Sequence, residues 1–184
     1  MKTVLIVLVL VLVLGGCSYI GMRNSLVTMD ENVNSAWAQV ETVLQRRYDL
    51  IPNLVNTVKG YAKHESGVFE EVTRLRSQWG EAKTQSDKVQ AANQIEGALS
   101  KLLLVSENYP ELKANQNFIA LQDELSGTEN RIAVERRRYN DIVKEFNASI
   151  RRFPTSVVAG MMGLQKRDYF EAEKGAAAAP KVEF

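Results

Sequence analysis

Residues 33–58 read VNSAWAQVETVLQRRYDLIPNLVNTV, and the spacing of their apolar side chains decides the fold. The apolar residues recur every three or four positions, which is typical of a helix with one buried face. Pro52 has no amide proton to donate, so we expect a kink there rather than an end, because the repeat resumes in phase beyond it. The stripe consists of Leu26, Met29, Val33, Trp37, Val40, Leu44, Ile51, Leu54 and Val58.

Three further amphipathic stretches follow, and no alternating pattern typical of strands appears after residue 23. Their apolar residues run over 68–79, 89–103 and 118–150. The helix that carries the last of these stretches is expected to begin near Pro110 and to end at Pro154. The polar stretch 80–88 predicts a turn, with Ser86 or Asp87 capping the helix after it.

These patterns predict an all-α fold, an antiparallel up-and-down bundle of long helices that follows an N-terminal membrane anchor. Four helices are the preferred arrangement. A three-helix bundle, with one uninterrupted second helix over about residues 64–108, is the alternative. In the four-helix arrangement the first and last long helices run antiparallel, so Asn24 should lie beside residues 150–153.

The N-terminal segment is apolar enough to require a lipid environment. Residues 3–22 contain no charge, and residues 4–14 are an unbroken run of Val, Leu and Ile. One interpretation is a lipoprotein signal peptide, in which Leu14-Gly15-Gly16-Cys17 is a lipobox and Cys17 becomes acylated. The other is an uncut transmembrane helix, since residues 4–22 at helical rise span about 28 Å. We favour the lipoprotein because the glycines and the lone cysteine fall where a lipobox has them.

The predicted organisation has three parts. Residues 1–23 are a signal peptide with lipobox or a transmembrane anchor, residues 24–165 the helical bundle, and residues 166–184 a flexible C-terminal tail. The tail prediction rests on residues 175–180, Gly-Ala-Ala-Ala-Ala-Pro, which offer little side chain to bury.

Two blocks of sequence resemble the LemA family of bacterial membrane-associated proteins. The first contains NSAW (34–37), LQRRYDLIPNLV (44–55) and VKGYA (58–62). The second contains YPELKAN (109–115), TEN (128–130) and RRYN (137–140). The resemblance covers roughly residues 24–165, and it implies a short membrane anchor followed by an antiparallel helical bundle. The structural or binding motif positions that it marks are Trp37, Arg46, Arg47, Pro52, Asn53, Tyr109, Pro110, Glu129, Asn130, Tyr139 and Asn140.

Charge and composition exclude several classes. The formal net charge is +1, so the basic excess of a nucleic-acid binder is missing, and we expect no nucleic-acid partner. Cys17 is the only cysteine, so no disulfide can form within the chain. The single histidine, His64, offers neither a metal cluster nor a base for a nucleophile. We therefore expect no catalytic residue, no metal and no cofactor, and a protein that is not an enzyme.

Charged and aromatic side chains in the helices are expected to be structural. Arg47 falls on the buried stripe and needs a partner, which we expect to be Glu129 or Glu135 of the last helix. The alternative is that Arg46 and Arg47 clamp a phosphate or carboxylate. The aromatic residues at helical spacing are expected in the core. The basic residues Arg136, Arg137, Arg138, Arg151 and Arg152 are expected on the solvated surface, or against anionic lipid or protein.

Two functions are compatible with these features. The first is a non-enzymatic scaffold or interaction protein, anchored in the membrane of the bacterial cell envelope, that binds an unknown protein partner or associates with itself. The alternative is a membrane-shaping or lipid-surface-binding protein that uses the amphipathic segment 156–164.

Overall fold

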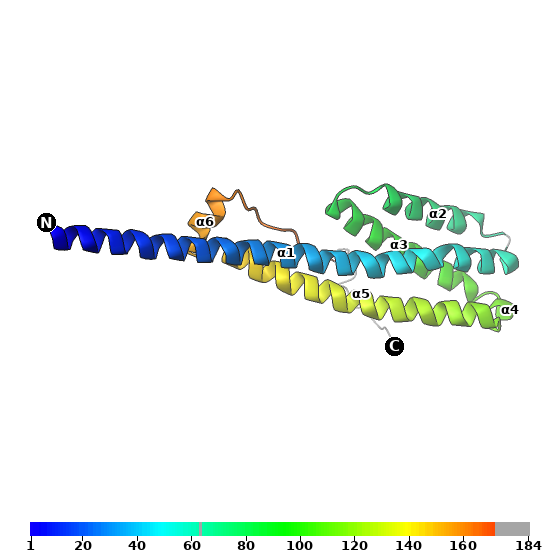
Figure 1. Ribbon diagram of the computed structural model, residues 1–184. Helices are drawn as coiled ribbons and strands as arrows, with labels where there is room; N and C mark the ends of the chain where they lie inside the picture. Colours follow the sequence, from blue (N-terminus) through cyan, green and yellow to red (C-terminus); the bar gives the residue numbers. More distant parts are fainter. Residues whose placement is uncertain (63, 172–184) are drawn as a thin grey trace, which may run out of the picture. The chain divides into compact units, whose positions relative to one another are not determined.

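The computed structural model describes residues 1–62 and 64–171, and every regular element in this part of the chain is a helix. The all-α fold expected from the sequence is confirmed. The helices are α1 (Lys2–Tyr61), α2 (Ser66–Glu81), α3 (Gln85–Ser106), α4 (Pro110–Lys113), α5 (Gln116–Ser149) and α6 (Thr155–Met161) (Figure 1).

The chain divides into two compact units. The first unit consists of Met1–Gln39 and Arg137–Tyr169. The second consists of Val40–Arg136 and Phe170–Phe184, of which residues 170 and 171 are the described part of the last stretch. Both α1 and α5 contribute residues to each unit.

The second unit contains four longer helices, α1 from residue 40, α2, α3, and α5 up to residue 136, and the short α4 between α3 and α5. Near the end of α1, the Tyr61 hydroxyl accepts a hydrogen bond from Asn115 at 2.9 Å. Earlier in α1, Arg46 lies 2.6 Å from Glu124. The later residue of α1, Tyr61, contacts the start of α5, and the earlier residue, Arg46, contacts a position further along α5. The two helices are therefore antiparallel.

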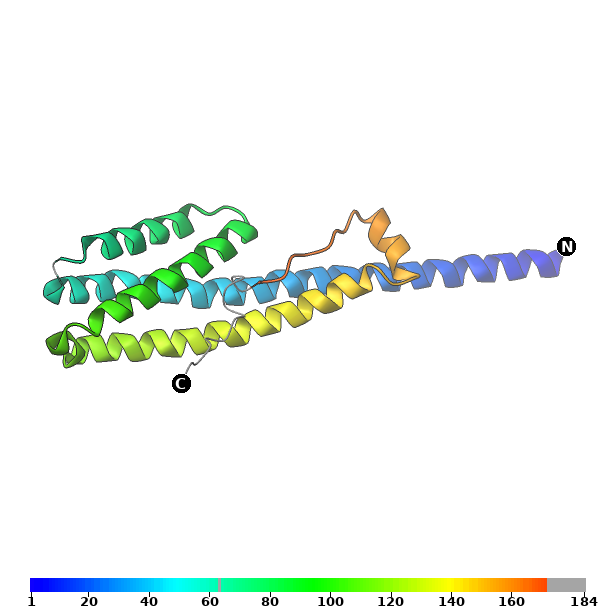
Figure 2. The ribbon, with the colours of Figure 1, turned by 180° about the vertical axis from the view of Figure 1, so that it is seen from behind.

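Helices α2 and α3 complete this up-down-up-down arrangement as an antiparallel hairpin (Figure 2). Lys101 of α3 pairs with Glu71 of α2 at 3.2 Å. The chain turns between Glu81 and Gln85, inside the stretch where the sequence predicts a turn. The four-helix arrangement is therefore confirmed for this unit, and the uninterrupted helix of the three-helix alternative is wrong.

Helix α1 supplies the buried stripe that its sequence predicts. Ile51, Leu54 and Val58 are each at most 1% exposed. Tyr48, which was not among the predicted stripe residues, is also buried, at 2% exposed. Burying a side chain of this size contributes roughly 1.5–3 kcal/mol, so the stripe holds α1 in the bundle. Pro52 lies inside the helix, which continues to Tyr61 as expected.

Two helix starts differ from the prediction. Helix α3 is capped by Thr84, whose hydroxyl accepts from the Asp87 amide at 3.1 Å, and not by Ser86 or Asp87. The last long helix does not start at Pro110, because Asn115 interrupts it. The Asn115 side-chain oxygen accepts from the amide of Phe118 at 3.1 Å and so caps α5, leaving α4 as a separate turn.

In the first unit, α1 and α5 again run antiparallel. Trp37 and Tyr139 meet edge to face, with ring centroids 5.6 Å apart. Towards the N-terminus, Leu26 packs with Val158 and Ala159 of α6, and Tyr19, Met22, Ile150, Met162 and Leu164 pack against this cluster. Met22, Leu26 and Ile150 share this cluster, so the end of α5 lies near the stretch of α1 that contains Asn24, as the antiparallel arrangement predicts.

A segment after α6 returns along the first unit and is held by polar contacts. The Tyr139 hydroxyl donates to the Asp168 carbonyl at 2.8 Å, and Arg167 pairs with Asp30 at 2.8 Å. In the second unit, Phe170 is 4% exposed. Residues 166–171, expected to be part of a flexible tail, are thus in contact with the helices, because they carry side chains that can pair and pack. The rest of the expected tail, residues 172–184, lies outside the described residues.

The N-terminal part of α1 has the properties of a membrane span. It is the one helix in the described chain long and apolar enough to cross a bilayer, with a mean hydropathy of 2.7 over its most apolar window. Its side chains at residues 4–10 and 12–14 are exposed in the protein. Exposed apolar surface of this extent requires a nonpolar environment.

Candidate functional site

The motif over residues 44–55 divides its side chains between two sides of α1. Tyr48 and Ile51 are buried, and the Arg47 side chain is 11% exposed. Arg46 and Asn53 are exposed. The motif therefore has an inward half that packs the second unit and an outward half that is open to a partner.

The outward half lines a groove between α1 and α5, which we call the α1–α5 groove. It has a volume of about 680 Å³. Arg46 closes one side through Glu124, with its Nε and Nη2 atoms 3.0 and 2.6 Å from the same carboxylate oxygen. Both partners are largely exposed, so this pair adds well under about 1 kcal/mol to stability. The lining residues are Arg46, Leu50, Asn53, Asn56, Thr57, Asn117, Ala120, Leu121 and Glu124.

The inward half contains Arg47, whose charge needs a partner because it lies on the buried side of α1. Arg47 pairs with Glu129 of α5, one of the two acids expected from the sequence. Its Nε atom is buried without a hydrogen-bond partner among the described residues. Asn130 lies beside this pair in a smaller groove of about 270 Å³. The pair joins α1 to α5 and fixes their register, because a guanidinium this deeply buried is costly without its carboxylate.

Tyr48 lies next to Arg47 in the interior of the second unit. Its ring stacks on Trp79 of α2, with centroids 4.4 Å apart and an angle of 28° between the planes. Burial raises the pKa of Tyr48 well above its usual range, and the charges of Arg47 and Arg136 oppose that rise. The Trp79 indole donates to Gln45 at 3.4 Å. The hydroxyl is thus kept neutral, and this group is part of the core.

Arg136 was expected on the basic, solvated surface of the last helix, but it is largely buried. Its side chain is 16% exposed, and its Nη1 atom lies 3.5 Å from Glu96 of α3. The guanidinium carbon lies 4.3 Å from the centre of the Phe170 ring. The prediction failed because Phe170, which covers this arginine, lies in a segment expected to be free of the bundle. Arg137, Arg138, Arg151 and Arg152 are exposed.

The remaining motif residues lie apart from the α1–α5 groove. Tyr109 precedes α4 and Pro110 is its first residue. Proline suits this position, because the backbone N–H that it lacks would have no partner within the helix. Trp37, Tyr139 and the half-buried Asn140 belong to the first unit. Cys17 is an exposed thiol on α1.

Several contact residues were not found from the sequence. Glu124 completes the α1–α5 groove, and Asn147 and Arg167 hold the segment after α6. Glu124 could have been found, because it lies five residues before Glu129 on α5, as a candidate partner for Arg46, which is next to Arg47 in α1. Asn147 carried a weaker signal, a polar residue next to buried Phe146.

The α1–α5 groove contains polar groups that can form hydrogen bonds with a ligand. The α1–α5 groove presents amides, one hydroxyl and an ion pair, none of which is a nucleophile set against a base. Across residues 1–62 and 64–171, no group of three or more His, Cys, Asp or Glu is placed to hold a metal ion.

The LemA family profile matches residues 36–184. A protein named LemA from Metamycoplasma hominis is 26% identical over 157 residues, which cover 85% of this chain and 72% of that protein. Magnetosome protein MamQ 2 from Paramagnetospirillum magneticum is 26% identical over 185 residues, covering 86% of this chain and 68% of the relative. MamQ from Magnetospirillum gryphiswaldense is 25% identical with the same coverage. The first unit's Trp37 and Tyr139 and the whole α1–α5 groove fall inside the matched region, and the chain belongs to the LemA family.

Proposed function

We propose that this LemA family protein is a non-enzymatic, membrane-anchored scaffold of the bacterial cell envelope. The observation that carries the proposal is the α1–α5 groove, where the outward residues of the family motif are open and unused by the core. Arg46 and Asn53, two motif residues in this groove, are exposed, and the Arg46 ion pair adds little to stability, so a partner is the best explanation for them.

The chemistry of the groove indicates a polypeptide partner. Asn53, Asn56 and Asn117 carry amides that can both donate and accept, as a peptide backbone does. Leu50 and Leu121 add apolar surface between them. We infer that the occupant is a segment of another protein, with a second copy of this chain as the competing outcome.

Position-specific crosslinking in native membranes tests this proposal. Benzoylphenylalanine at Asn56 or Asn117 should give a discrete adduct, and Arg46→Ala should weaken it. Asn32 is the matched control, because it is also an exposed asparagine of α1 but lies outside the groove. An adduct of twice the chain's mass identifies self-association. Equal labelling at Asn32 and Asn56 contradicts a specific docking groove.

For the anchor, we infer acylation of Cys17 after removal of residues 1–16. The support is the exposed position of this thiol at the end of the apolar stretch of α1. The uncut transmembrane helix remains the alternative, since the same residues are long enough to span.

Lipid-surface binding is the second candidate function. It is favoured by one observation: the cluster that α6 forms with Leu26 also contacts Tyr19 and Met22, which lie at the end of the uncharged segment 3–22. This role is compatible with a scaffold, because the lipid-facing and partner-facing residues differ.

A further inference from the structure

Helix α6 is apolar on both of its sides. Val158 and Ala159 are buried against Leu26. On the other side, Val157 is 56% exposed and Met161 is 71% exposed, and Phe153 just before the helix is 85% exposed. Val157 and Met161 are four residues apart and share one face of α6, and we call these two residues, together with Phe153 before the helix, the α6 surface. A soluble protein rarely leaves such a surface uncovered.

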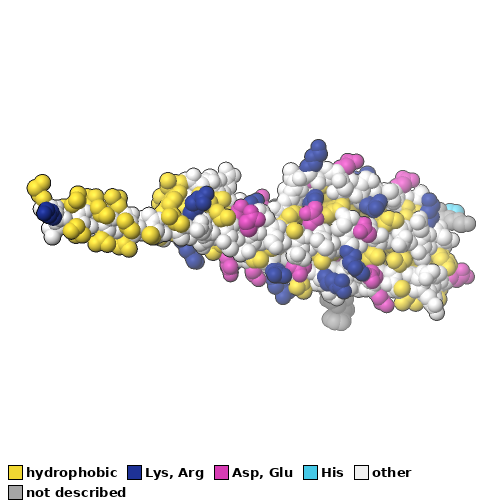
Figure 3. All heavy atoms as spheres, viewed as in Figure 1, with side chains coloured by type: hydrophobic (Ala, Val, Ile, Leu, Met, Phe, Trp, Pro, Cys, Tyr) yellow, Lys and Arg dark blue, Asp and Glu magenta, His cyan; other side chains and the backbone are white. Residues whose placement is uncertain are grey.

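The α6 surface adjoins the membrane segment. Tyr19 and Met22 of α1 pack against the cluster formed by Leu26, Val158 and Ala159. Met22 follows Leu14, the last residue of the apolar run, by about 12 Å of helical rise. Figure 3 shows hydrophobic side chains gathered over α6 and over the neighbouring start of α1, with basic side chains among them. Whether the chain is acylated at Cys17 or spans with residues 4–22, the headgroup layer falls at this level.

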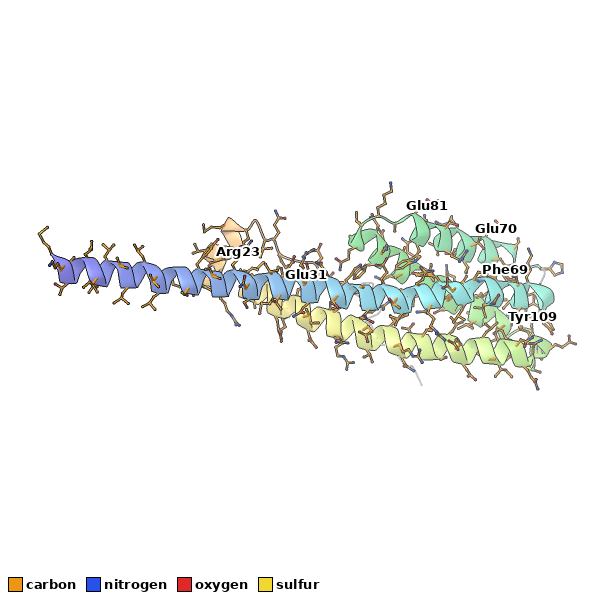
Figure 4. All side chains as sticks on the ribbon, viewed as in Figure 1. Arg23, Glu31, Phe69, Glu70, Glu81 and Tyr109 are labelled. Carbon is orange, nitrogen blue, oxygen red and sulfur yellow. The ribbon has the colours of Figure 1, made fainter. Side chains whose placement is uncertain are left out.

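The stretches of sequence that form this end of the first unit carry charges of one sign. Residues 3–29 and 151–164 contain no Asp or Glu, and their charged residues are Arg23, Arg151 and Arg152. Arg151 and Arg152 are exposed directly before Phe153. Arg23 lies on the stretch of α1 beside α6 (Figure 4) and is exposed. Arginines placed at the edge of an apolar surface match the anionic headgroups of a phospholipid leaflet.

We propose that α6 is an interfacial helix that rests in the membrane holding the anchor. Phe153, Val157 and Met161 enter the boundary of the acyl chains, and Arg151, Arg152 and Arg23 contact anionic phospholipid headgroups. This inference rests on the proposed membrane anchorage and adds the lipid-contacting residues to it. It gives the first unit a second point of attachment, besides the anchor in α1, which limits how this unit can tilt in the membrane.

The test places an environment-sensitive fluorescent amino acid at single positions of the full chain, so that Cys17 is kept. The chain is reconstituted in phosphatidylcholine vesicles with or without phosphatidylglycerol. Quenching by doxyl-labelled lipid reports contact with acyl chains, and quenching by iodide reports contact with water. Val157 is the test position, and Val134 is its matched control, because it is the same residue type and is 59% exposed.

We expect the probe at Val157 to be quenched by doxyl lipid and protected from iodide, and the probe at Val134 to show the reverse. Phosphatidylglycerol should strengthen the binding of the α6 surface to the vesicle. Replacing Arg151 and Arg152 by Gln should reduce this gain in binding by about fivefold per arginine. Flotation of the vesicles on a density gradient measures anchorage separately, whether or not residues 1–16 are removed. If the chain floats with the vesicles while Val157 reports water, the anchorage stands and this inference is overturned. If the chain does not float with the vesicles, the proposed anchorage itself fails. Protection of Val157 from both quenchers shows that protein covers the surface, and this overturns the lipid assignment.

Discussion

The side chain of Asn147 forms two hydrogen bonds with the backbone of Arg167. Its Nδ2 atom donates to the Arg167 carbonyl at 2.9 Å, and its Oδ1 atom accepts from the Arg167 amide at 2.8 Å. Asn147 is 5% exposed, so both bonds are shielded from water. The Asn147 side chain on α5 thus pairs with both backbone groups of Arg167 and holds the segment that follows α6 in place.

Replacing Asn147 by Ala should therefore leave two backbone groups unpaired and cost about 2 kcal/mol of the free energy of unfolding. Denaturation in detergent measures this cost, and hydrogen exchange at the Arg167 amide should accelerate. Asn93→Ala is the control, because Asn93 makes one exposed bond to the Glu171 carbonyl, and its loss should cost about 0.5 kcal/mol or less. Equal costs for the two variants would contradict the role given to Asn147.

Arg47→Ala should remove the ion pair that joins α1 to α5. We expect a loss of about 2 kcal/mol, which is below the cost of breaking a fully buried pair because Glu129 is 39% exposed. Arg46→Ala breaks an exposed pair one residue away and should cost under about 1 kcal/mol. The two melting curves, compared in one buffer, decide the matter. If Arg46→Ala proves the more destabilising, the assignment of inward and outward halves of the motif is wrong.

Tyr48 should make the stability of the second unit depend on alkaline pH. Burial raises its pKa in the folded protein above the ordinary value of about 10. As pH rises past about 10, the unfolded chain loses the phenol proton first, so the free energy of unfolding falls, whereas below that pH the contribution of Tyr48 is fully present. Tyr48→Phe should show a shallower fall in melting temperature above pH 10. Tyr61→Phe is the control, since that ring is 38% exposed, and it should keep the slope of the unmodified protein.

Gly163 ends α6 with a positive φ of 68°. The Gly163 amide bonds to the Gly160 carbonyl and the Leu164 amide bonds to the Ala159 carbonyl, the pattern of a Schellman motif. Gly163→Ala should cost roughly 1 kcal/mol, because a side chain is strained in this conformation. Gly160→Ala has open space for its methyl group and should stabilise the helix instead. Hydrogen exchange in α6 should therefore respond in opposite directions, and a common direction would contradict this account.

Cys17→Ser should abolish acylation and leave a precursor that retains residues 1–16. The measurement is incorporation of labelled fatty acid together with the mass of the membrane-bound chain. Ser18→Ala is a neighbouring change that should preserve both. Unchanged mass and membrane retention in the Cys17 variant would favour the transmembrane helix.

The long helices could be predicted because their evidence is local. Apolar residues at three- and four-residue spacing identified α1, α2, α3 and most of α5, and the phase of the repeat carried α1 through Pro52. The buried stripe also placed Arg47 against an acid of the last long helix. The helices follow from the residues on one helical face. The pairing of Arg47 follows from the electrostatic cost of burying an unpaired charge.

The missed features depend on residues that are distant in the sequence or on a choice between similar caps. Thr84 and Ser86 are both good capping residues, and the backbone conformation at Thr84 decides between them. Arg136 looked like a surface residue because its cover, Phe170, comes 34 positions later. Asn147 bonds to the backbone of Arg167, and backbone partners leave no mark in residue types.

The division of the chain has a consequence for its synthesis. Apart from the residues after 169, the second unit is one uninterrupted stretch, so its helices can pair as soon as they leave the ribosome. The first unit joins residues near the start to residues near the end, as in the contact of Asp30 with Arg167 across 137 positions. The Met1–Gln39 part of α1 therefore stays without its partner in the first unit until Arg137–Tyr169 have been synthesised. A chaperone or the translocation machinery would meet that helix in this interval, and a truncated chain would keep it exposed.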